Sequence, residues 1–210
     1  MATNGVDTGN DGLSWSQPLA TISNALAKAG TVKNETIWVS NGVYALSASV
    51  DNPAAKACKI RAWSTHAADT VLQGPGTGSN IRGVTMDGAG SLLEGFTVRN
   101  FCVTNMNCAG VYCKAGLVKN CVVANNMIDG APEYNSGGGV YLIDGGAIAD
   151  STITGNLLGP NMVGSCRGAG IFAYNSGTIT NCEINCNTNT GKAYAYGGGV
   201  WVSYPCKVRS

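Results

Sequence analysis

Apolar and polar residues alternate in four short segments in the second half of the chain. In each segment a glycine is followed by an apolar residue, an aromatic residue and a further small or apolar residue. The segments are AGVYC (Ala109–Cys113), SGGGVYL (Ser136–Leu142), RGAGIFA (Arg167–Ala173) and YGGGVWV (Tyr196–Val202). Alternation with a period of two residues predicts short β-strands that bury one face.

These segments recur at a nearly constant interval. Their glycines, Gly110, Gly139, Gly170 and Gly199, are separated by 29, 31 and 29 residues. A second set keeps the same interval: Leu117–Asn126, Ala147–Asn156 and Thr178–Asn187, with a weaker early copy at Leu92–Phe101. Identical short strands can recur when each pairs in parallel with its equivalent one turn later. The sequence therefore predicts an all-β fold, a right-handed parallel β-helix or β-solenoid.

The register of the repeat predicts which side chains point inward. The expected inward columns are Val111, Val140, Ile171 and Val200; Cys113, Leu142, Ala173 and Val202; Val118, Ile148, Ile179 and Val208; Cys121, Ser151 and Cys182; and Val123, Ile153 and Ile184. Asn120, Asp150 and Asn181 fall at a corner, because Asn and Asp tolerate left-handed backbone. The glycines before each strand mark a corner with little room for a side chain.

The N-terminal third follows the repeat less regularly. Ser14–Gly30 predicts a short amphipathic helix, with Ser16 as its N-cap and Pro18 in its first turn, that covers one end of the coil. Strand-like segments follow at Thr36–Tyr44, Lys59–Trp63, Thr70–Gly74 and Ile81–Met86. We expect a single domain over 1–210: a cap over about 1–35, irregular coils over 36–100 and regular coils over 101–210. Val208 begins another copy of the second segment, which favours a natural protein that continues beyond Ser210 over one that self-assembles end to end as a filament.

Several segments resemble a known group of proteins. GNDGLSWSQPLATISNAL, TIWVSNGVY, LLEGFTVRN and the repeated GGGVYL and ITNCEI phrases are similar to bacterial right-handed parallel β-helix repeat proteins of the pectin-lyase-like superfamily. The resemblance covers the chain from Gly9 to Val208. It implies the fold and a secreted or surface location, but it does not select an activity, because the superfamily includes polysaccharide lyases, hydrolases, phage tailspikes and adhesins.

Composition narrows the classes of partner. Only 12% of the residues are charged and the net charge is +1, so the chain lacks the basic surface of a nucleic-acid-binding protein. No apolar run reaches the length of a membrane span. The first ten residues lack the pattern of a secretory signal, so an exported natural protein would carry its signal outside this sequence. We expect an extracellular or cell-surface location.

Nine cysteines, an odd number, leave at least one unpaired within the chain. Cys113, Cys121 and Cys182 take inward positions, as small apolar residues do. Cys102 with Cys108, and Cys166 with Cys186, are the disulfide candidates, and both pairs require an oxidising compartment. The sequence has no CxxC pair and one histidine, His66, so we expect neither a metal site nor a cofactor.

Two groups of residues are candidates for binding a polysaccharide or a surface glycan. The segments between the repeated strands (Phe101–Ala109, Met127–Ser136, Leu157–Arg167 and Thr188–Tyr196) line up on one rim, and they contain Asp129, Glu133, Tyr134, Arg167, Lys192, Tyr194 and Tyr196. Tyr112, Tyr141, Phe172 and Trp201 fall between inward positions and predict an outward aromatic column. The alternatives are that the rim consists of solvated loops and that the column stabilises the strands.

Catalysis has weaker support in the sequence. A polysaccharide hydrolase needs two opposed carboxylates, and Asp129 with Glu133 or Asp144 with Asp150 are the pairs that can meet. The paired-Asp, Gly-His-Gly and Arg-x-Lys signatures of the pectin hydrolases are absent. We therefore expect no catalytic residues and a scaffold or adhesin-like module that binds carbohydrate. The alternative is a polysaccharide lyase or glycoside hydrolase that acts through the rim.

Overall fold

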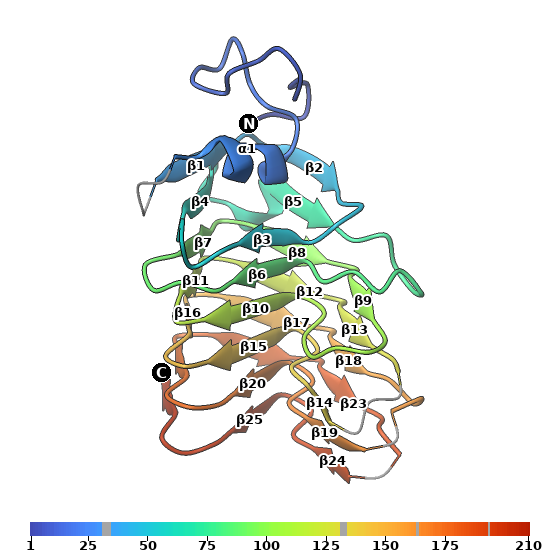
Figure 1. Cartoon of the computed structure of the whole chain (residues 1–210). Coiled ribbons are helices and arrows are strands. Elements are labelled where there is room, and N and C mark those ends of the chain that lie inside the picture. The colour runs from blue at the N-terminus through green and yellow to red at the C-terminus, as the bar shows by residue number, and fades with distance from the viewer. Residues whose placement is uncertain (31–34, 131–133, 163, 193) are drawn as a thin grey trace.

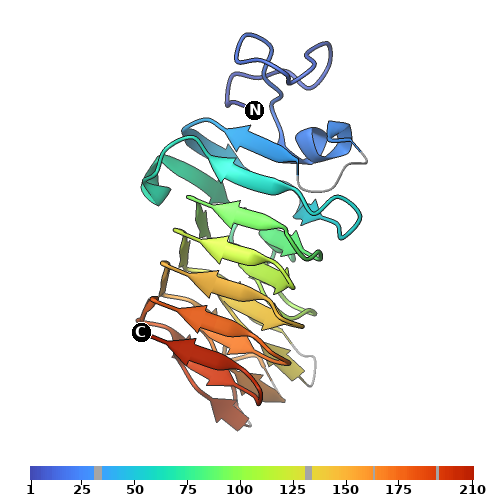
Figure 2. The same cartoon turned by 90° about the vertical axis from the view of Figure 1, so that its left-hand side faces the viewer.

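The chain winds into a parallel β-solenoid of about six turns, in a right-handed sense (Figure 1). This computed structural model describes residues 1–30, 35–130, 134–162, 164–192 and 194–210. Figure 2 shows the coils stacked from the N-terminal to the C-terminal end, each strand lying over its equivalent in the next coil. Both the fold class and the stacking of equivalent residues are as the repeat predicts.

In the described residues, five sheets run along the solenoid, and a complete turn passes through them in the order A, B, D, E, C. Sheet A contains β1 (Thr36–Val39), β4 (Lys59–Ala62), β7 (Leu92–Glu94), β11 (Leu117–Lys119), β16 (Ala147–Ala149), β21 (Thr178–Thr180) and β26 (Lys207–Arg209). Sheet B contains β2 (Gly42–Ala45), β5 (Thr70–Gln73), β8 (Thr97–Arg99), β12 (Val122–Ala124), β17 (Thr152–Thr154) and β22 (Glu183–Asn185). Sheet C contains β3 (Val50–Asn52), β6 (Val84–Met86), β10 (Val111–Lys114), β15 (Val140–Ile143), β20 (Ile171–Ala173) and β25 (Val200–Val202).

Sheets D and E are shorter and begin later in the chain. Sheet D contains β9 (Cys102–Val103), β13 (Met127–Ile128), β18 (Leu157–Leu158) and β23 (Thr188–Asn189), and sheet E contains β14 (Tyr134–Ser136), β19 (Ser165–Arg167) and β24 (Tyr194–Tyr196). All of these strands pair in parallel with their neighbours. The segments between the repeated strands, which were expected to line up on one rim, therefore carry two further sheets.

The register of the strands confirms the inward columns. Val140 pairs with Val111 on one side and with Ile171 on the other, and all three side chains are fully buried. Ile148 is likewise buried between Val118 and Ile179. Burial decreases in the last coil, where β25 and β26 each pair on one side only. One continuous apolar core thus fills the tube.

The corners have the backbone that their residues predict. Asn120, Asp150 and Asn181 have φ angles of 50°, 51° and 47°, in the left-handed region. Gly139 has another reason to be glycine: a Cβ there would lie 2.7 Å from Asn156 Nδ2 and 2.8 Å from the Gly170 carbonyl oxygen. Adjacent coils approach too closely at this corner to accommodate a side chain.

The N-terminal helix is shorter than predicted. Helix α1 spans Ile22–Lys28, and its N-cap is Thr21, whose hydroxyl accepts a hydrogen bond from Asn24 N at 3.2 Å, so the assignment of Ser16 as the cap is wrong. Asp7 Oδ1 accepts hydrogen bonds from Ala20 N and Thr21 N, which holds the chain extended up to Thr21. The helix buries Ile22 and Leu26 against the first coil, as expected of a cap. In the described part of the chain, no helix has the length and hydropathy needed to cross a membrane.

The first coils are less irregular than the sequence indicates. The segment Thr36–Tyr44 divides into β1 and β2, which are separated by a corner at Ser40 and Asn41. A short 3-10 helix, η1 (Ala67–Asp69), precedes β5. The early strands of sheets A, B and C pair in register with the later ones, so the early coils differ chiefly in lacking strands of sheets D and E.

The predicted disulfides do not form in the structure, where all nine cysteines are free. Cys102 lies in β9 of sheet D, whereas Cys108 occupies the corner before β10 and directs its thiol to the Gly139 carbonyl, at 3.7 Å. Cys166 is buried in β19 of sheet E, and Cys186 is exposed at the corner between β22 and β23. In each proposed pair, one cysteine lies in a strand and the other at a corner, a separation that sequence proximity does not reveal.

Candidate functional site

The outward aromatic column forms as predicted on sheet C. Parallel pairing aligns Tyr112 with Tyr141, Tyr141 with Phe172 and Phe172 with Trp201. The ring centroids of these successive pairs are 5.3, 4.7 and 4.8 Å apart, and the interplanar angles are 20°, 33° and 2°. These separations are in the range of favourable aromatic pairs.

Most of the column is packed against itself. Phe172 is only 5% exposed, since it is stacked between Tyr141 and Trp201, while the other three rings are half-buried. Loss of solvent raises the pKa of the Tyr141 hydroxyl to about 12 and also raises that of Tyr112. The middle of the column therefore stabilises the sheet, and a ligand can reach the rings mainly at its ends.

An arginine lies against each end of the column. The Arg82 guanidinium carbon lies 4.9 Å from the centroid of the Tyr112 ring, and its nitrogens donate to the carbonyls of Asn107 and Cys108 at 2.6 and 3.1 Å. Arg167 lies 5.0 Å from the Trp201 ring and 5.9 Å from the Tyr196 ring. Arg82 is thus fixed by the backbone, whereas Arg167 joins two aromatic residues from different sheets.

The contacts of Arg167 bring several predicted residues together. Arg167 ends β19 and pairs with Tyr196 of β24, and the corner at Gly168 then leads the chain into β20, which carries Phe172. Tyr194 and Tyr196 stack at 6.4 Å, and both are exposed. We call this surface the Arg167 patch; it comprises Arg167, Phe172, Tyr174, Tyr194, Tyr196 and Trp201.

Tyr174 is the residue of this patch that the sequence did not indicate. Its ring stacks on Phe172 at 6.4 Å and is about half exposed. The residue follows the end of β20, where strand alternation no longer predicts the direction of a side chain.

The remaining rim candidates lie apart from these contacts or outside the described structure. Asp129 accepts hydrogen bonds from the backbone and the side chain of Asn161, at 3.1 and 2.9 Å, which fixes one coil to the next. Lys192 is exposed, and its backbone N donates to the Met162 carbonyl. Glu133 lies outside the described residues, and Tyr134 is described only by its backbone in β14.

The acidic residues considered for catalysis are engaged in contacts between coils. Asp144 accepts from Asn175 at 2.6 Å and lies 3.5 Å from Lys114 Nζ. Asp150 accepts from Asn181 at 2.8 Å and lies 3.9 Å from Lys119 Nζ. Each carboxylate therefore contacts residues of the two adjacent coils, at the corner where it lies. Among the described residues, no group of three His, Cys, Asp or Glu side chains could hold a metal ion.

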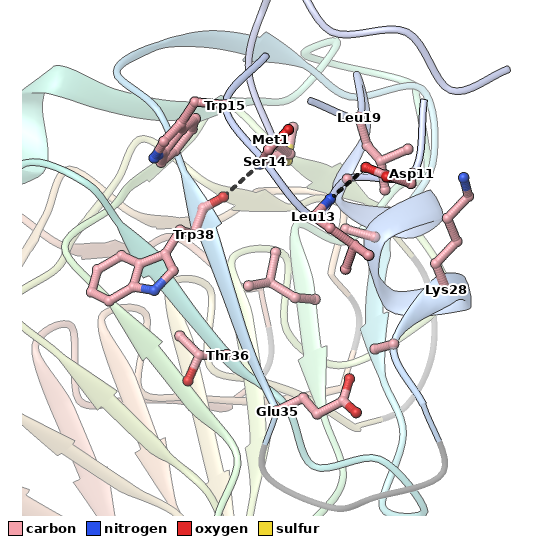
Figure 3. A pocket seen from close by; sticks show the side chains of 14 residues that line it. Met1, Asp11, Leu13, Ser14, Trp15, Leu19, Lys28, Glu35, Thr36 and Trp38 are labelled. Atoms are coloured by element: carbon pink, nitrogen blue, oxygen red, sulfur yellow. Dashed lines mark hydrogen bonds between the residues drawn. The ribbon is translucent and has the colours of Figure 1, made fainter. Parts of the chain in front are cut away.

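A second candidate surface, which the sequence analysis missed, lies at the N-terminal end. Trp15, Trp38 and Trp63 form an exposed cluster. The cluster lies beside a pocket of about 350 Å³ between β1, α1 and the preceding segment, and Figure 3 shows this pocket with Trp15 and Trp38 in its lining. Composition was the one sequence feature that pointed to this surface, since the chain has only four tryptophans. The fold brings three of them together here. Their positions follow no repeat, and the register argument therefore could not place them together.

Comparison of the chain with family models, with curated proteins and with solved structures found no match.

Proposed function

We propose that this chain is a non-catalytic module of an extracellular or cell-surface protein that presents a rigid surface for binding carbohydrate. In this proposal, the module is a scaffold or adhesin-like relative of the bacterial β-helix proteins of the pectin-lyase-like superfamily. The observation that carries the proposal is the Arg167 patch, in which residues from sheets E and C converge. The superfamily relationship rests on the sequence phrases and the β-solenoid fold alone.

The chemistry of the patch suits a sugar chain. The C–H groups of a pyranose ring pack well on exposed aromatic faces, which Tyr174, Tyr194 and Tyr196 provide. The planar guanidinium of Arg167 supplies fixed hydrogen-bond donors for hydroxyl or carboxylate oxygens. Because Arg167, Tyr194 and Tyr196 lie in paired strands, little conformational entropy is lost when a ligand binds.

The bonding of the carboxylates favours binding over catalysis. A general acid and base must face a common space where the substrate lies. Asp129, Asp144 and Asp150 instead accept hydrogen bonds from asparagines of the next coil. These contacts support a structural role for the carboxylates.

A glycan array followed by calorimetric titration of the best ligand tests the proposal. We expect Trp201→Ala and Tyr196→Ala each to weaken binding at least tenfold, because each removes a ring in contact with Arg167. Tyr204→Ala is the matched control, since Tyr204 is an exposed tyrosine of the last coil outside the patch. Binding that is equal in all three variants would contradict the proposal, and release of unsaturated or reducing sugar from the ligand would favour the lyase or hydrolase alternative.

A further inference from the structure

Three exposed tryptophans lie together at the N-terminal end of the solenoid. Trp38 points outward from β1 because its neighbours Ile37 and Val39 are buried in the core. Trp63 contacts both other indoles edge to face, at 5.7 Å from Trp38 and 5.2 Å from Trp15. The three residues are 49% (Trp15), 42% (Trp38) and 60% (Trp63) exposed. Such a contiguous apolar surface on a chain otherwise rich in polar residues indicates a binding role.

The cluster is held in a fixed geometry. Trp63 N donates to the Val39 carbonyl at 2.7 Å, which ties the residue to the end of β1. The guanidinium carbon of Arg61 lies 5.9 Å from the Trp38 ring, and Arg61 itself forms an ion pair with Glu94 at 3.0 Å. The indoles therefore form a preorganised platform rather than three independent side chains.

Two of the indoles line a pocket of about 350 Å³, within the usual size range of small-molecule sites, roughly 300–1,000 Å³. Figure 3 shows Trp15 and Trp38 on one side of the pocket, with Lys28 of α1 on the other and Glu35 below. Apolar atoms of Leu13 and Leu19 complete the lining. The pocket thus combines aromatic faces with a small number of charged groups.

The carboxylates of the pocket retain capacity for a ligand. Asp11 uses Oδ1 to accept from Leu13 N at 2.8 Å, and Glu35 uses Oε2 to accept from Gly30 N at 2.9 Å. Among the described residues, the structure gives no hydrogen bond to the second oxygen of either group. These oxygens can therefore accept hydrogen bonds from hydroxyl groups.

The charged groups that line the pocket are of both signs. The carboxylates of Asp11 and Glu35 are opposed by the ammonium groups of Lys28 and the Met1 terminus. The terminal ammonium donates to the Trp38 carbonyl at 2.7 Å, and burial lowers its pKa. A lining with nearly balanced charge has no strong preference for an anion or a cation, so hydrogen bonding and apolar contact determine which ligand binds.

We propose that this pocket binds the end of a neutral oligosaccharide. The apolar face of a terminal pyranose lies on Trp15 and Trp38, and its hydroxyls donate to Asp11 and Glu35. The pocket lies at the opposite end of the solenoid from the Arg167 patch (Figure 1) and uses none of its residues, so it is a second, independent site.

Tryptophan fluorescence provides a direct test. In a Trp201→Phe background, the three remaining tryptophans are those of the cluster, so any spectral change on adding a ligand reports on this end of the molecule. The probes are neutral tetrasaccharides built from glucose, galactose, xylose, mannose or N-acetylglucosamine, with uronic-acid tetrasaccharides as the charged comparison. We expect a saturable change with at least one neutral probe and a weaker response to the charged ones.

Calorimetry of variants then locates the site. We expect Trp38→Ala and Glu35→Gln each to weaken neutral-sugar binding at least tenfold, while Tyr204→Ala, which alters an exposed residue outside both surfaces, leaves it unchanged. Unaltered circular dichroism of each variant controls for folding, and Glu35→Gln changes only the charge and hydrogen bonding of a surface group. Absence of binding to any neutral probe, tighter binding of the charged probes, or equal binding by Trp38→Ala would overturn the proposal. Loss through Tyr196→Ala alone would assign the sugar to the Arg167 patch instead.

Discussion

Asparagines at equivalent positions of successive coils, Asn126, Asn156 and Asn187, hold each coil to the next. Asn156 accepts hydrogen bonds from the backbone N and the side-chain amide of Asn126, both at 3.0 Å. Its own amide donates to the Val123 carbonyl and to Asn187 Oδ1, each at 2.9 Å. Every polar atom of this side chain is satisfied in the core, as burial of an amide requires.

Replacing Asn156 with alanine should destabilise the protein strongly. The change removes the acceptor of the Asn126 backbone N and of one Asn126 amide hydrogen, as well as the amide that donates to the Val123 carbonyl. Losing these bonds in a dry interior should cost roughly 2–4 kcal/mol. Urea unfolding followed by circular dichroism measures the loss. Asn185→Ala is the control, because Asn185 is exposed, and its replacement should cost less than about 1 kcal/mol. Equal losses from the two variants would argue against an internal ladder.

Three buried thiols should make the free energy of unfolding decrease as the pH rises into the alkaline range. Burial raises the pKa of Cys108 from 9.0 to about 12, and those of Cys113 and Cys121 to about 11. Above pH 9 the thiols of the unfolded chain ionise while the folded ones stay protonated, so the folded state binds more protons and the free energy of unfolding falls. Between pH 8 and pH 10 we expect a loss of about 1.4 kcal/mol per thiol.

Urea unfolding under reducing conditions at pH 8, 9 and 10 measures this slope. The variant Cys113→Ala should lose about 1.4 kcal/mol less than the unaltered protein between pH 8 and pH 10, because one buried thiol is gone. Burial also raises the pKa of Cys58, Cys166 and Cys182, so these thiols add to the slope that remains. Alanine already occupies the equivalent position of a later coil, at Ala173, so the control should fold. A free energy of unfolding that stays constant across this range in the native protein would contradict the burial of these thiols.

The individual elements differ in how far the sequence predicts them. β10 and β15 have four residues each and alternate clearly between buried and outward positions, so both strands and their register were predictable. The strands of sheet D contain two residues, and no period can be expressed in so short a segment. The aromatic column was predictable because it repeats once per coil. The contact of Arg167 with Trp201 depends on the bend at Gly168, and the tryptophan cluster joins residues that belong to no repeat.

The aromatic column should contribute to stability mainly through its buried middle. Phe172→Ala removes a ring stacked on both sides and should cost roughly 3–5 kcal/mol. Tyr174→Ala removes an exposed ring stacked on the same phenylalanine and should cost less than about 1 kcal/mol. Thermal unfolding of the two variants gives the comparison, and a larger loss for Tyr174→Ala would refute the packing described for the column.

At the scale of the whole molecule, each coil contacts mainly its two neighbours, so a complete coil is a removable unit. The chain from Val140 to Gly170 contains one equivalent of every regular sheet, from β15 through β19. Its ends meet equivalent positions, because Val140 pairs with Ile171 across adjacent coils. Deleting this segment joins Gly139 to Ile171 and restores the sequence glycine–apolar residue–aromatic residue found at the corners before β10, β15, β20 and β25.

We expect the protein without residues 140–170 to fold as a solenoid that is shorter by one turn. Tyr112 then stacks on Phe172 and Asn126 bonds to Asn187, since each residue meets the next member of its own column. A control that lacks only residues 140–154 loses half a coil, which places outward residues opposite inward columns and should prevent cooperative folding. Circular dichroism and urea unfolding distinguish the two. If the full-coil deletion unfolds while the half-coil deletion folds, equivalence between coils does not determine this structure.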